Sequence, residues 1–408
     1  MKRLIGLFFL SLASCLGSEE ATSSPLETVA LRNPYQLQQV IQGTNKFGFD
    51  LYKQLKARNG NLLFSPFSIA NSLCLIEMGA RGTTGDKFAK LLNFSTSLAP
   101  LSGDLTSIFT NPHPQKGENQ LLIASNLWLP SGYTVNKAYE RAAHYNFGVI
   151  VESFDFKAEP ITALRKMNQT IAAKTKNKIN DAILVSDLPQ DKGMLVSAEI
   201  ALIAEWETPF DILRTKRMPF KVSQTYSNNI DMLQLLASLN YRSDELLTMV
   251  EIPFKYSPQI GAQLALYILL TKRPDQLGNL EEQLNHDKWI QWISELHPSK
   301  IHLSLPRFRD DIRLDISTLL KKNGMKEAWS PQEANFSGIA TGLYLNKLIH
   351  KTFLRIDEKG SDVYAASPGS HTETNKAERE IAVDHPFIYL IADKKTNTII
   401  FLGRMLQP

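Results

Sequence analysis

A long polar stretch close to the end of the chain most constrains what this sequence can fold into. Residues 357–387 read DEKGSDVYAASPGSHTETNKAEREIAVDHPF, in which both ends look structured and the middle is small, polar and without apolar periodicity. A run this long without secondary structure is uncommon inside a compact domain, where it is usually functional or disordered. The fold must therefore hold a long loop between two strand-like ends.

The segments around this loop predict a mixture of helices and strands. Phe47, Leu51 and Leu55 lie on one face of a helix expected over residues 34–58, which Asn59-Gly60 would stop. Two further helices are expected over 66–79 and 314–325, and strands over 124–130, 194–206, 246–254, 263–271 and 300–308, with a C-terminal pair joined at 394–397. The helices and strands do not alternate regularly as βαβ units, which predicts an α+β fold.

The composition is that of an ordinary globular protein. Of 408 residues, 43% are hydrophobic and 21% are charged, and 45 basic residues nearly balance 41 acidic ones, for a net charge of +4. So small an excess of charge gives no electrostatic case for binding nucleic acid. We therefore expect a mixed, solvated surface and no nucleic-acid partner.

The first fourteen residues predict export. Lys2 and Arg3 precede the apolar run Leu4–Ala13, which is too short to span a bilayer as a helix and fits a secretory signal over residues 1–14. The run ends in LASC, which resembles the bacterial lipoprotein box, where the cysteine is acylated and the chain is cut just before it. Cys15 would then anchor the protein to a membrane.

An ordinary signal, cut nearby, remains the alternative and would leave a freely secreted protein. Either way we expect an extracellular or cell-envelope location. Residues 15–34 are rich in Ser, Glu and Thr and are predicted to form a lipidated or flexible tether, followed by one domain over residues 35–408.

The sequence lacks the common motifs of hydrolase and metalloprotease active sites. It contains no G-x-S-x-G elbow and no H-E-x-x-H pair, and its eight histidines are scattered. Residues 79–87, GARGTTGDK, superficially resemble a phosphate loop, but the Gly and Lys spacing is wrong and a turn between two helices is expected instead. We therefore expect no catalytic residues, no metal, no cofactor and no enzyme activity.

Five motifs together resemble the serpin family over nearly the whole chain after residue 35. They are NLLFSPFSIANSL (61–73), GARGTTGDK (79–87), EANFSGI (333–339), LIHKTFLRIDEKGS (348–361) and DHPFIYLIADKKTNTIIFLGRMLQP (384–408). The resemblance implies a monomer with about nine helices packed around three mainly antiparallel sheets, and an exposed reactive-centre loop over residues 360–383.

The resemblance also implies a mechanism. The loop is bait for a serine protease, which attacks it and forms an acyl-enzyme; the cut loop then inserts as a new strand in the large sheet and traps the protease. The same trap can capture a cysteine protease. The alternative within the family is a non-inhibitory serpin that acts as a binding or carrier module.

Matching EKGS to the family's hinge makes Glu358 and Gly360 the start of the inserting segment. In a buried strand alternate residues face the core. Ser361, Val363 and Ala365 would face inward, with Ser367 and Gly369, while Ala366 faces outward; all the inward residues are small and uncharged. Two departures oppose insertion, namely Tyr364 in a run that is usually small and Pro368, which lacks an N–H for the ladder.

Counting sixteen residues from Glu358 places the reactive bond at Thr374–Asn375. A slightly longer loop would place it at Asn375–Lys376 or Lys376–Ala377. Thr at the cut suggests an elastase-like target, whereas Lys376 or Arg379 suggests a trypsin-like one, because a basic side chain fits an acidic specificity pocket. Solvated loop charge explains the two basic residues equally well.

The resemblance maps further residues onto the region where the sheet opens. Ser65, Ser68 and His350 match the polar cluster beneath the opening, but the Asn that usually completes this cluster is Ala198 here, so a buried His350 must find another partner. Trp206 matches the family's Trp at the top of the opening, and it fits equally well as an aromatic core residue.

Overall fold

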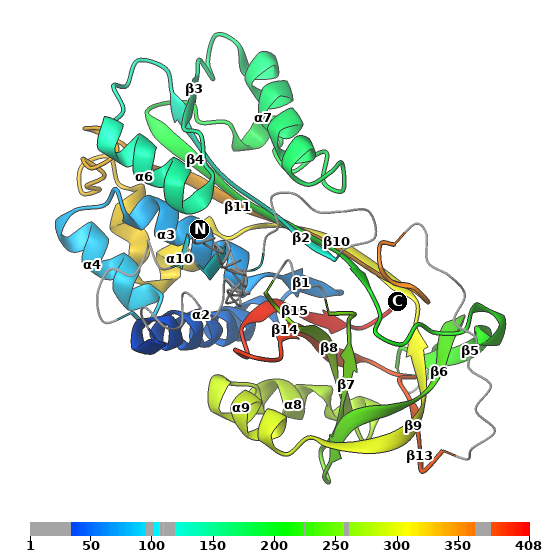
Figure 1. Cartoon of the computed structure of the whole chain (residues 1–408). Helices are drawn as coiled ribbons and strands as arrows, with labels where there is room; N and C mark the ends of the chain where they lie inside the picture. The colour runs from blue at the N-terminus through cyan, green and yellow to red at the C-terminus, as the bar shows by residue number, and fades with distance from the viewer. Residues whose placement is uncertain are drawn as a thin grey trace, which may run out of the picture.

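Two β-sheets and the helices packed against them make up the computed structural model, which describes residues 34–94, 102, 103, 105, 106, 109, 119–223, 225–256, 261–363 and 377–408 (Figure 1). Both helices and strands occur throughout these residues, so the predicted α+β class is confirmed. The helices with bounds in this part of the chain are α2 (Pro34–Leu55), α3 (Pro66–Glu77), α4 (Gly82–Leu91), α6 (Lys137–Phe147), α7 (Pro160–Lys174), α8 (Leu277–Gln283), α9 (His286–Ser294) and α10 (Ser317–Leu320).

The smaller sheet contains the region of interest. Its strand order is β10 (Phe308–Asp315), β11 (Tyr344–Ile356), β12 (Gly360–Ser361), β4 (Gly193–Glu205), β2 (Gln120–Pro130) and β3 (Glu152–Phe154). β4 and β11 also pair directly with each other, in parallel, below the short strand β12.

The larger sheet has nine strands. Along its path lie β1 (Leu62–Phe64), β15 (Ile399–Met405), β14 (Phe387–Asp393), β8 (Leu264–Thr271), β7 (Leu247–Pro253), β6 (Ser227–Ser243), β9 (His297–Pro306) and β13 (Arg379–Ala382), with β5 (Lys216–Lys221) paired to β6. We expected three sheets. The second and third are hydrogen-bonded into one, because the first residues of the long strand β6 pair with β5 and its last residues pair with β7.

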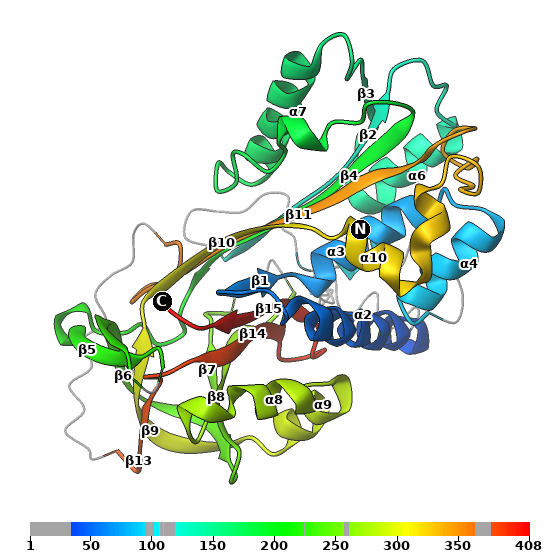
Figure 2. The ribbon, with the colours of Figure 1, turned by 180° about the vertical axis from the view of Figure 1, so that it is seen from behind.

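Helices cover both faces of the smaller sheet. α7 lies across one face, and α3, α4 and α10 lie on the other (Figures 1 and 2). Met167 and Ile171 of α7 pack on Leu195, Ile349 and neighbouring residues of the sheet in a separate apolar cluster, whereas α3 belongs to the main core. β4 is therefore buried on both faces, which is why its sequence reads as a nearly continuous apolar run.

Several predicted boundaries differ from the structure, three of them in helices or the turn between helices. The first helix ends at Leu55, because Arg404 donates to the carbonyls of Lys56, Arg58 and Gly60 and satisfies the groups beyond its last turn. The turn predicted over 79–87 is confined to residues 78–81, and the rest of the motif begins α4. The helix predicted over 314–325 starts at Ser317, since residues 314 and 315 belong to β10, and it closes through Gly324 in the left-handed region (φ 90°).

Candidate functional site at the β4–β11 seam

The line along which β4 and β11 pair, called the seam below, runs through the middle of the smaller sheet. The two strands are parallel and pair from Tyr344 opposite Gly193 to Phe353 opposite Ala201. Above Phe353 they no longer pair with each other, because the chain turns back between them. The seam therefore has a closed part and an open end.

The hinge segment (Asp357–Val363) occupies the open end. After β11 the chain makes a turn, closed by hydrogen bonds between Asp357 and Gly360, and returns as β12. Gly360 lies opposite Glu205, and Ser361 lies opposite Ala204 on one side and Ile356 on the other. The first two residues of the range predicted as loop are thus already a strand in the uncut chain, and residues 379–382 at its far end form β13.

Gly360 is required by the space between the strands. Its φ is +147°, and a Cβ there would lie 1.8 Å from the carbonyl oxygen of Ala204, so no other residue fits without moving the backbone. Ser361 follows with its side chain fully buried, and its Oγ donates to the carbonyl of Leu202 at 2.9 Å. A small inward-facing residue was expected at this position. Ser361 fits there because the carbonyl of Leu202 accepts the hydrogen bond of its buried hydroxyl.

Glu358 holds the turn from outside the sheet. Thr215 Oγ1 donates to its carboxylate at 2.7 Å, Arg307 forms an ion pair with the same oxygen, and Phe210 N donates to its carbonyl at 2.9 Å. Burial acts to raise the pKa of Glu358, but the hydrogen bonds from Thr215 and Arg307 outweigh it and lower the pKa. The carboxylate is therefore charged at neutral pH and fixes the start of the hinge segment.

Trp206 sits directly at the open end of the seam. Its indole Nε1 donates to the carbonyl of Asp357 at 2.8 Å, and its backbone N donates to the carbonyl of Lys359 at 2.9 Å. The ring stacks on Phe254 with centroids 4.3 Å apart and an interplanar angle of 8°. The two interpretations of this residue are thus compatible, since it packs in the core and also binds the hinge segment.

Asp362 ends strand β12. Its backbone lies in the left-handed region (φ 52°), and its side chain is buried and forms an ion pair with Lys178, which follows α7. Nothing in the local sequence points to this pair. Val363 is partly buried, and of the four candidates for the reactive bond only Ala377, also partly buried, is described. The predicted hinge residues Ala365 and Ala366, the cleavage candidates Thr374, Asn375 and Lys376, and the lipidation candidate Cys15 lie outside the described residues.

Arg379, the second basic residue considered for cleavage, is fixed in a sheet. It pairs with Ile301 in strand β13, and its guanidinium lies 5.7 Å from the centre of the Tyr241 ring. Its backbone is thus held in β13 of the larger sheet.

The predicted polar cluster lies beneath the closed part of the seam, on the side of α3. His350 Nε2 accepts from Ser65 N at 2.9 Å, so the proton is on Nδ1, which donates to the carbonyl of Ala198 at 2.6 Å. Ser68 joins the cluster only through its backbone N, which donates to Ser65 Oγ at 3.0 Å. The side chain of Ala198 cannot bond to His350 as the family's usual Asn would. The backbone carbonyl of Ala198 accepts the hydrogen bond from His350 instead. Burial lowers the pKa of His350 to about 4, so the imidazole is neutral.

A second polar cluster, which the sequence reasoning missed, lies on the other face of the seam under α7. Glu199 is fully buried, accepts from Asn126 Nδ2 at 3.0 Å and has a pKa that burial raises to about 8. Lys174 at the end of α7 donates to Asn126 Oδ1 at 3.0 Å, and Lys351, opposite Glu199 on β11, pairs with Asp181 at 2.7 Å. The signal was present, because Glu199 is a single charge inside an apolar strand.

The fold and the seam thus define an α+β protein whose smaller sheet takes up the first residues of the segment that follows β11. A family model described as "Serpin (serine protease inhibitor)" matches residues 42–408. The chain therefore belongs to the serpin family.

Named relatives cover the chain almost completely. Leukocyte elastase inhibitor A of Mus musculus is 26% identical over 91% of this chain and 100% of its own length. The crystal structure of Serpin48, described as a highly specific serpin of the insect Tenebrio molitor, is 25% identical with a TM-score of 0.77, over 93% of this chain and 98% of the other. Human thyroxine-binding globulin in complex with thyroxine shares the fold, at 24% identity and a TM-score of 0.81, over 91% and 99%.

Membership indicates a function of the protease-inhibitor type in general. Among the described residues, no group of three or more His, Cys, Asp or Glu side chains could hold a metal ion. None of the described helices is long and apolar enough to cross a bilayer.

Proposed function

We propose that the protein is a suicide-substrate inhibitor of serine proteases. The observation that carries the proposal is β12, in which Gly360 and Ser361 already pair between β4 and β11 in the antiparallel register that a fully inserted loop would continue. Cleavage beyond this point would free the following residues to extend the strand. A protease attached as an acyl-enzyme would be carried along before it could deacylate.

The inward side of the seam suits such a strand. Ser361 is fully buried between the strands. The residues that follow at alternate positions are also small and uncharged, namely Val363, Ala365, Ser367 and Gly369. Pro368 removes one ladder hydrogen bond, at about 1 kcal/mol net. One such loss slows insertion, and a slower insertion lets more protease escape, so a measurable fraction of cleaved, uncomplexed protein is expected.

The decisive experiment is incubation with trypsin, with a pancreatic-type elastase and with a papain-type cysteine protease, followed by a denaturing gel. A covalent complex that survives denaturation supports the proposal, and the masses of the released fragments choose between Thr374–Asn375, Asn375–Lys376 and Lys376–Ala377. Cleavage without complex for every protease would contradict it and favour a substrate or carrier.

A matched pair of variants separates insertion from simple cleavage. Ser361→Arg places a charge at a fully buried position of the seam, so we expect cleavage at the same bond but no complex. Ala382→Arg adds the same side chain at an exposed position of β13, at the far end of the predicted loop and after all the candidate bonds, and should leave complex formation unchanged.

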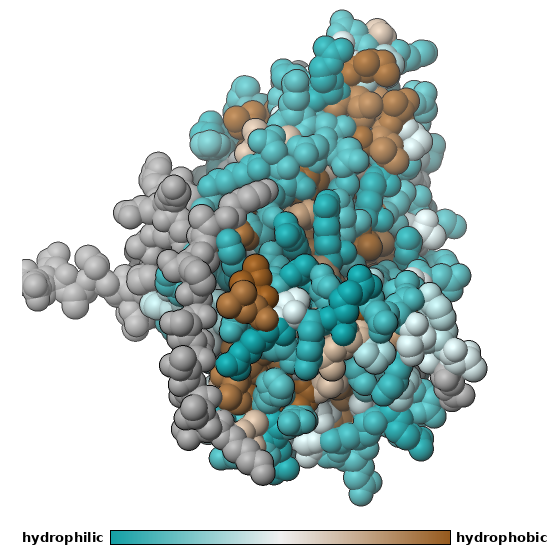
Figure 3. All heavy atoms as spheres, turned by 90° about the vertical axis from the view of Figure 1, so that its right-hand side faces the viewer, coloured by the Kyte–Doolittle hydropathy of each residue, from teal (hydrophilic) through white to brown (hydrophobic). Residues whose placement is uncertain are grey.

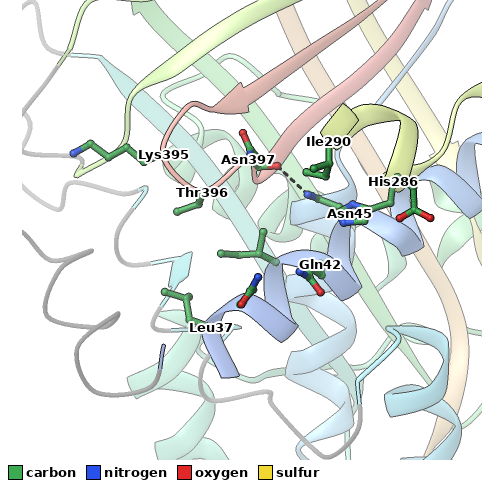
Figure 4. Close-up of a pocket in the computed structure, with 11 residues that line it drawn as sticks. Leu37, Gln42, Asn45, His286, Ile290, Lys395, Thr396 and Asn397 are labelled. Carbon is green, nitrogen blue, oxygen red and sulfur yellow. Dashed lines mark hydrogen bonds between the residues drawn. The ribbon is translucent and has the colours of Figure 1, made fainter. Parts of the chain in front are cut away.

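A cleft between α2, α9 and the turn after β14 favours carriage of a small molecule as the second candidate function (Figure 4). Its volume is about 630 Å³, within the usual range of about 300–1,000 Å³ for ligand pockets. Leu37, Ile41 and Ile290 give it apolar walls, and Lys395 lies at the β14–β15 turn (Figure 4). Burial, with help from Lys46, lowers the pKa of His286, so the imidazole in this cleft is uncharged at neutral pH.

Such a cleft would take an apolar molecule with one polar or anionic end. Titration with anilinonaphthalene sulfonate and with thyroxine, followed by fluorescence or calorimetry, tests the idea. Binding that is lost in Ile41→Trp, which fills the cleft, and kept in Ile161→Trp, at an exposed position of α7, would favour a carrier. Absence of saturable binding would remove this candidate.

For the location, we propose an exported protein anchored through Cys15, with residues 1–14 removed and residues 15–34 as a tether. The LASC motif supports the anchor. Cys15→Ser should release the protein from the membrane fraction; if the unchanged chain is already soluble outside the cell, the anchor is wrong and an ordinary signal is right. We also propose a monomer, because the face beside β5 and β13 shows small separate apolar patches on a mainly hydrophilic surface (Figure 3).

A further inference from the structure

The hinge segment stops after two residues, short of the closed part of the seam. Ser361 lies opposite Ala204, so the same register would bring Val363 opposite Leu202 and the next residue opposite Ala201. Ala201 is already paired with Phe353 across the closed part of the seam. Val363 is thus the last residue that this register places before the first β4–β11 pair, yet β12 ends at Ser361.

The chain leaves the strand at Asp362 through a conformation that a non-glycine residue seldom adopts (φ 52°). The Asp362 side chain is only 5% exposed and the Lys178 side chain 10%, and their charged atoms form an ion pair. A buried carboxylate without its cation is strongly unfavourable, so this pair gives a reason for the left-handed backbone. A specific contact therefore lies at the point where the strand stops.

Lys178 is presented by a rigid turn at the end of α7. Thr175 is fully buried and its Oγ1 donates to the carbonyl of Ile171 at 2.8 Å, while Asn177 N donates to Ala172 O at 2.8 Å. Lys176 and Asn177 both have positive φ, 48° and 60°, which turns the chain sharply just before Lys178. α7 lies across the sheet (Figure 1), and the turn after it presents Lys178 to Asp362 of the hinge segment.

We propose that the Lys178–Asp362 ion pair is a latch that holds the hinge segment two residues deep in the seam until the loop is cut. The inference rests on the proposed function and adds a regulated stop to it. Withdrawal of the hinge segment would carry Asp362 away from Lys178. Deeper insertion would require Asp362 to take up a strand conformation and the following residues to pass beside the turn that carries Lys178. The pair thus opposes motion in both directions.

The latch can be tested without any protease. In a Cys15→Ser background, Ser361→Cys introduces a thiol at a fully buried position, and the natural Cys74 is buried as well. We expect slow labelling by Ellman's reagent when Lys178 is present. Lys178→Met keeps the aliphatic stem but leaves the Asp362 carboxylate without a cation, so the hinge segment should withdraw and label at least about a hundredfold faster. Lys178→Arg, which keeps the charge, should label slowly.

A charge-swapped variant covers the case in which Lys178→Met unfolds the core. Unfolding would expose Cys74 too, and two thiols per chain would react instead of one. The combination of Lys178→Asp with Asp362→Lys restores an ion pair of reversed polarity, and it should return labelling to the slow rate, whereas Lys178→Asp alone should label fast. Equal labelling in Lys178→Met and in the unchanged pair, or no rescue by the swap, overturns the latch.

The result is separable from the inhibitory function. Fast labelling in Lys178→Met together with failure to capture any protease would keep the latch and reject the proposed function. Complex formation, together with a labelling rate that does not depend on the residue at position 178, would reject the latch and keep the proposed inhibitory function.

Discussion

The two parts of the seam differ in what lies between β4 and β11. At the open end the strands are separated by Gly360 and Ser361, so their edge groups are already paired with the hinge segment. In the closed part they pair directly, with neutral His350 below and Glu199 under α7. The comparison teaches that the sheet is partly opened in the uncut chain, and that insertion past Val363 must break the closed part and its two polar clusters.

α7 and the residues after it bridge the closed part from one face. Lys174 binds Asn126 and the carbonyl of Ser125 on the β2–β4 side. On the β11 side, Lys347 pairs with Asp187 at 3.0 Å and Lys351 with Asp181. Opening the closed part must therefore loosen several partly buried charged contacts together, whereas the open end depends on one glycine, one tryptophan and the two ion pairs of Glu358 and Asp362.

The largest effect is expected at the open end, from Gly360→Val. The new side chain would meet the carbonyl of Ala204 and occupy a disfavoured backbone conformation, which together destabilise the inserted hinge by about 4 kcal/mol. Hydrogen exchange at the amide of Ser361 should lose its protection. Gly278→Val is the matched control, since a Cβ at Gly278 meets no atom within 4 Å. Unchanged protection in Gly360→Val would mean that β12 is not held as described.

The next effect belongs to the α7 side of the closed part. Glu199 has a pKa of about 8 when folded against an ordinary value of 4.5, so the unfolded chain releases a proton that the folded chain keeps. Stability from this group is therefore present below pH 4.5 and is lost as pH rises, by about 3 kcal/mol between pH 5 and pH 7. Glu199→Gln should remove this slope in denaturant unfolding, whereas Glu245→Gln, at an exposed position, should keep it.

The α3 side should respond to pH in the opposite sense. His350 has a pKa of about 4 when folded against an ordinary 6.5, so the unfolded chain binds a proton first as pH falls. Its contribution to stability is complete above pH 6.5 and should fall by about 2 kcal/mol between pH 6.5 and pH 5. His350→Gln should flatten this part of the profile. A profile that stays as steep in His350→Gln as in His144→Gln, an exposed control, would contradict the assignment.

The smallest effect is expected from Trp206→Phe. The change keeps an aromatic ring against Phe254 and removes the hydrogen bond from Nε1 to Asp357, at about 1 kcal/mol. Amides of the hinge segment should exchange severalfold faster. Trp329→Phe removes a comparable bond, to the carbonyl of Asn346, away from the hinge, and should leave that exchange unaltered. Equal effects of the two variants would show that Trp206 acts only through general stability.

Strong local patterns gave the parts of the fold that could be foreseen. The periodic face of α2 and the apolar runs of β14 and β15 were found within a few residues, because burial on one or both sides dictates their sequence. The start of α4 at Gly82 was missed. Its first turn is supported by Asn335, whose backbone N donates to Thr84 Oγ1. Because the two residues are far apart in the chain, the sequence around Gly82 contains no signal of this contact.

The site was foreseen only where motifs carry it. Gly360, Ser361 and Trp206 were located through their resemblance to family motifs, and the structure adds why these residue types are needed there. The pairs Lys178–Asp362 and Lys174–Asn126 could not be foreseen, because each joins residues far apart in the chain and depends on how α7 lies over the sheet. Partners for a buried charge are a property of the assembled fold.

The pairing of β1 with β15 has a consequence for how the protein is made. β1 lies at the edge of the larger sheet against the last strand of the chain, and β15 in turn lies against β14. Both C-terminal strands are fully buried. A ribosome makes β14 and β15 long after β1, so β1 must wait without its neighbour until both have been synthesised. The larger sheet therefore closes only after β15 has left the ribosome, and a message cut short before β15 yields a polypeptide that cannot complete it.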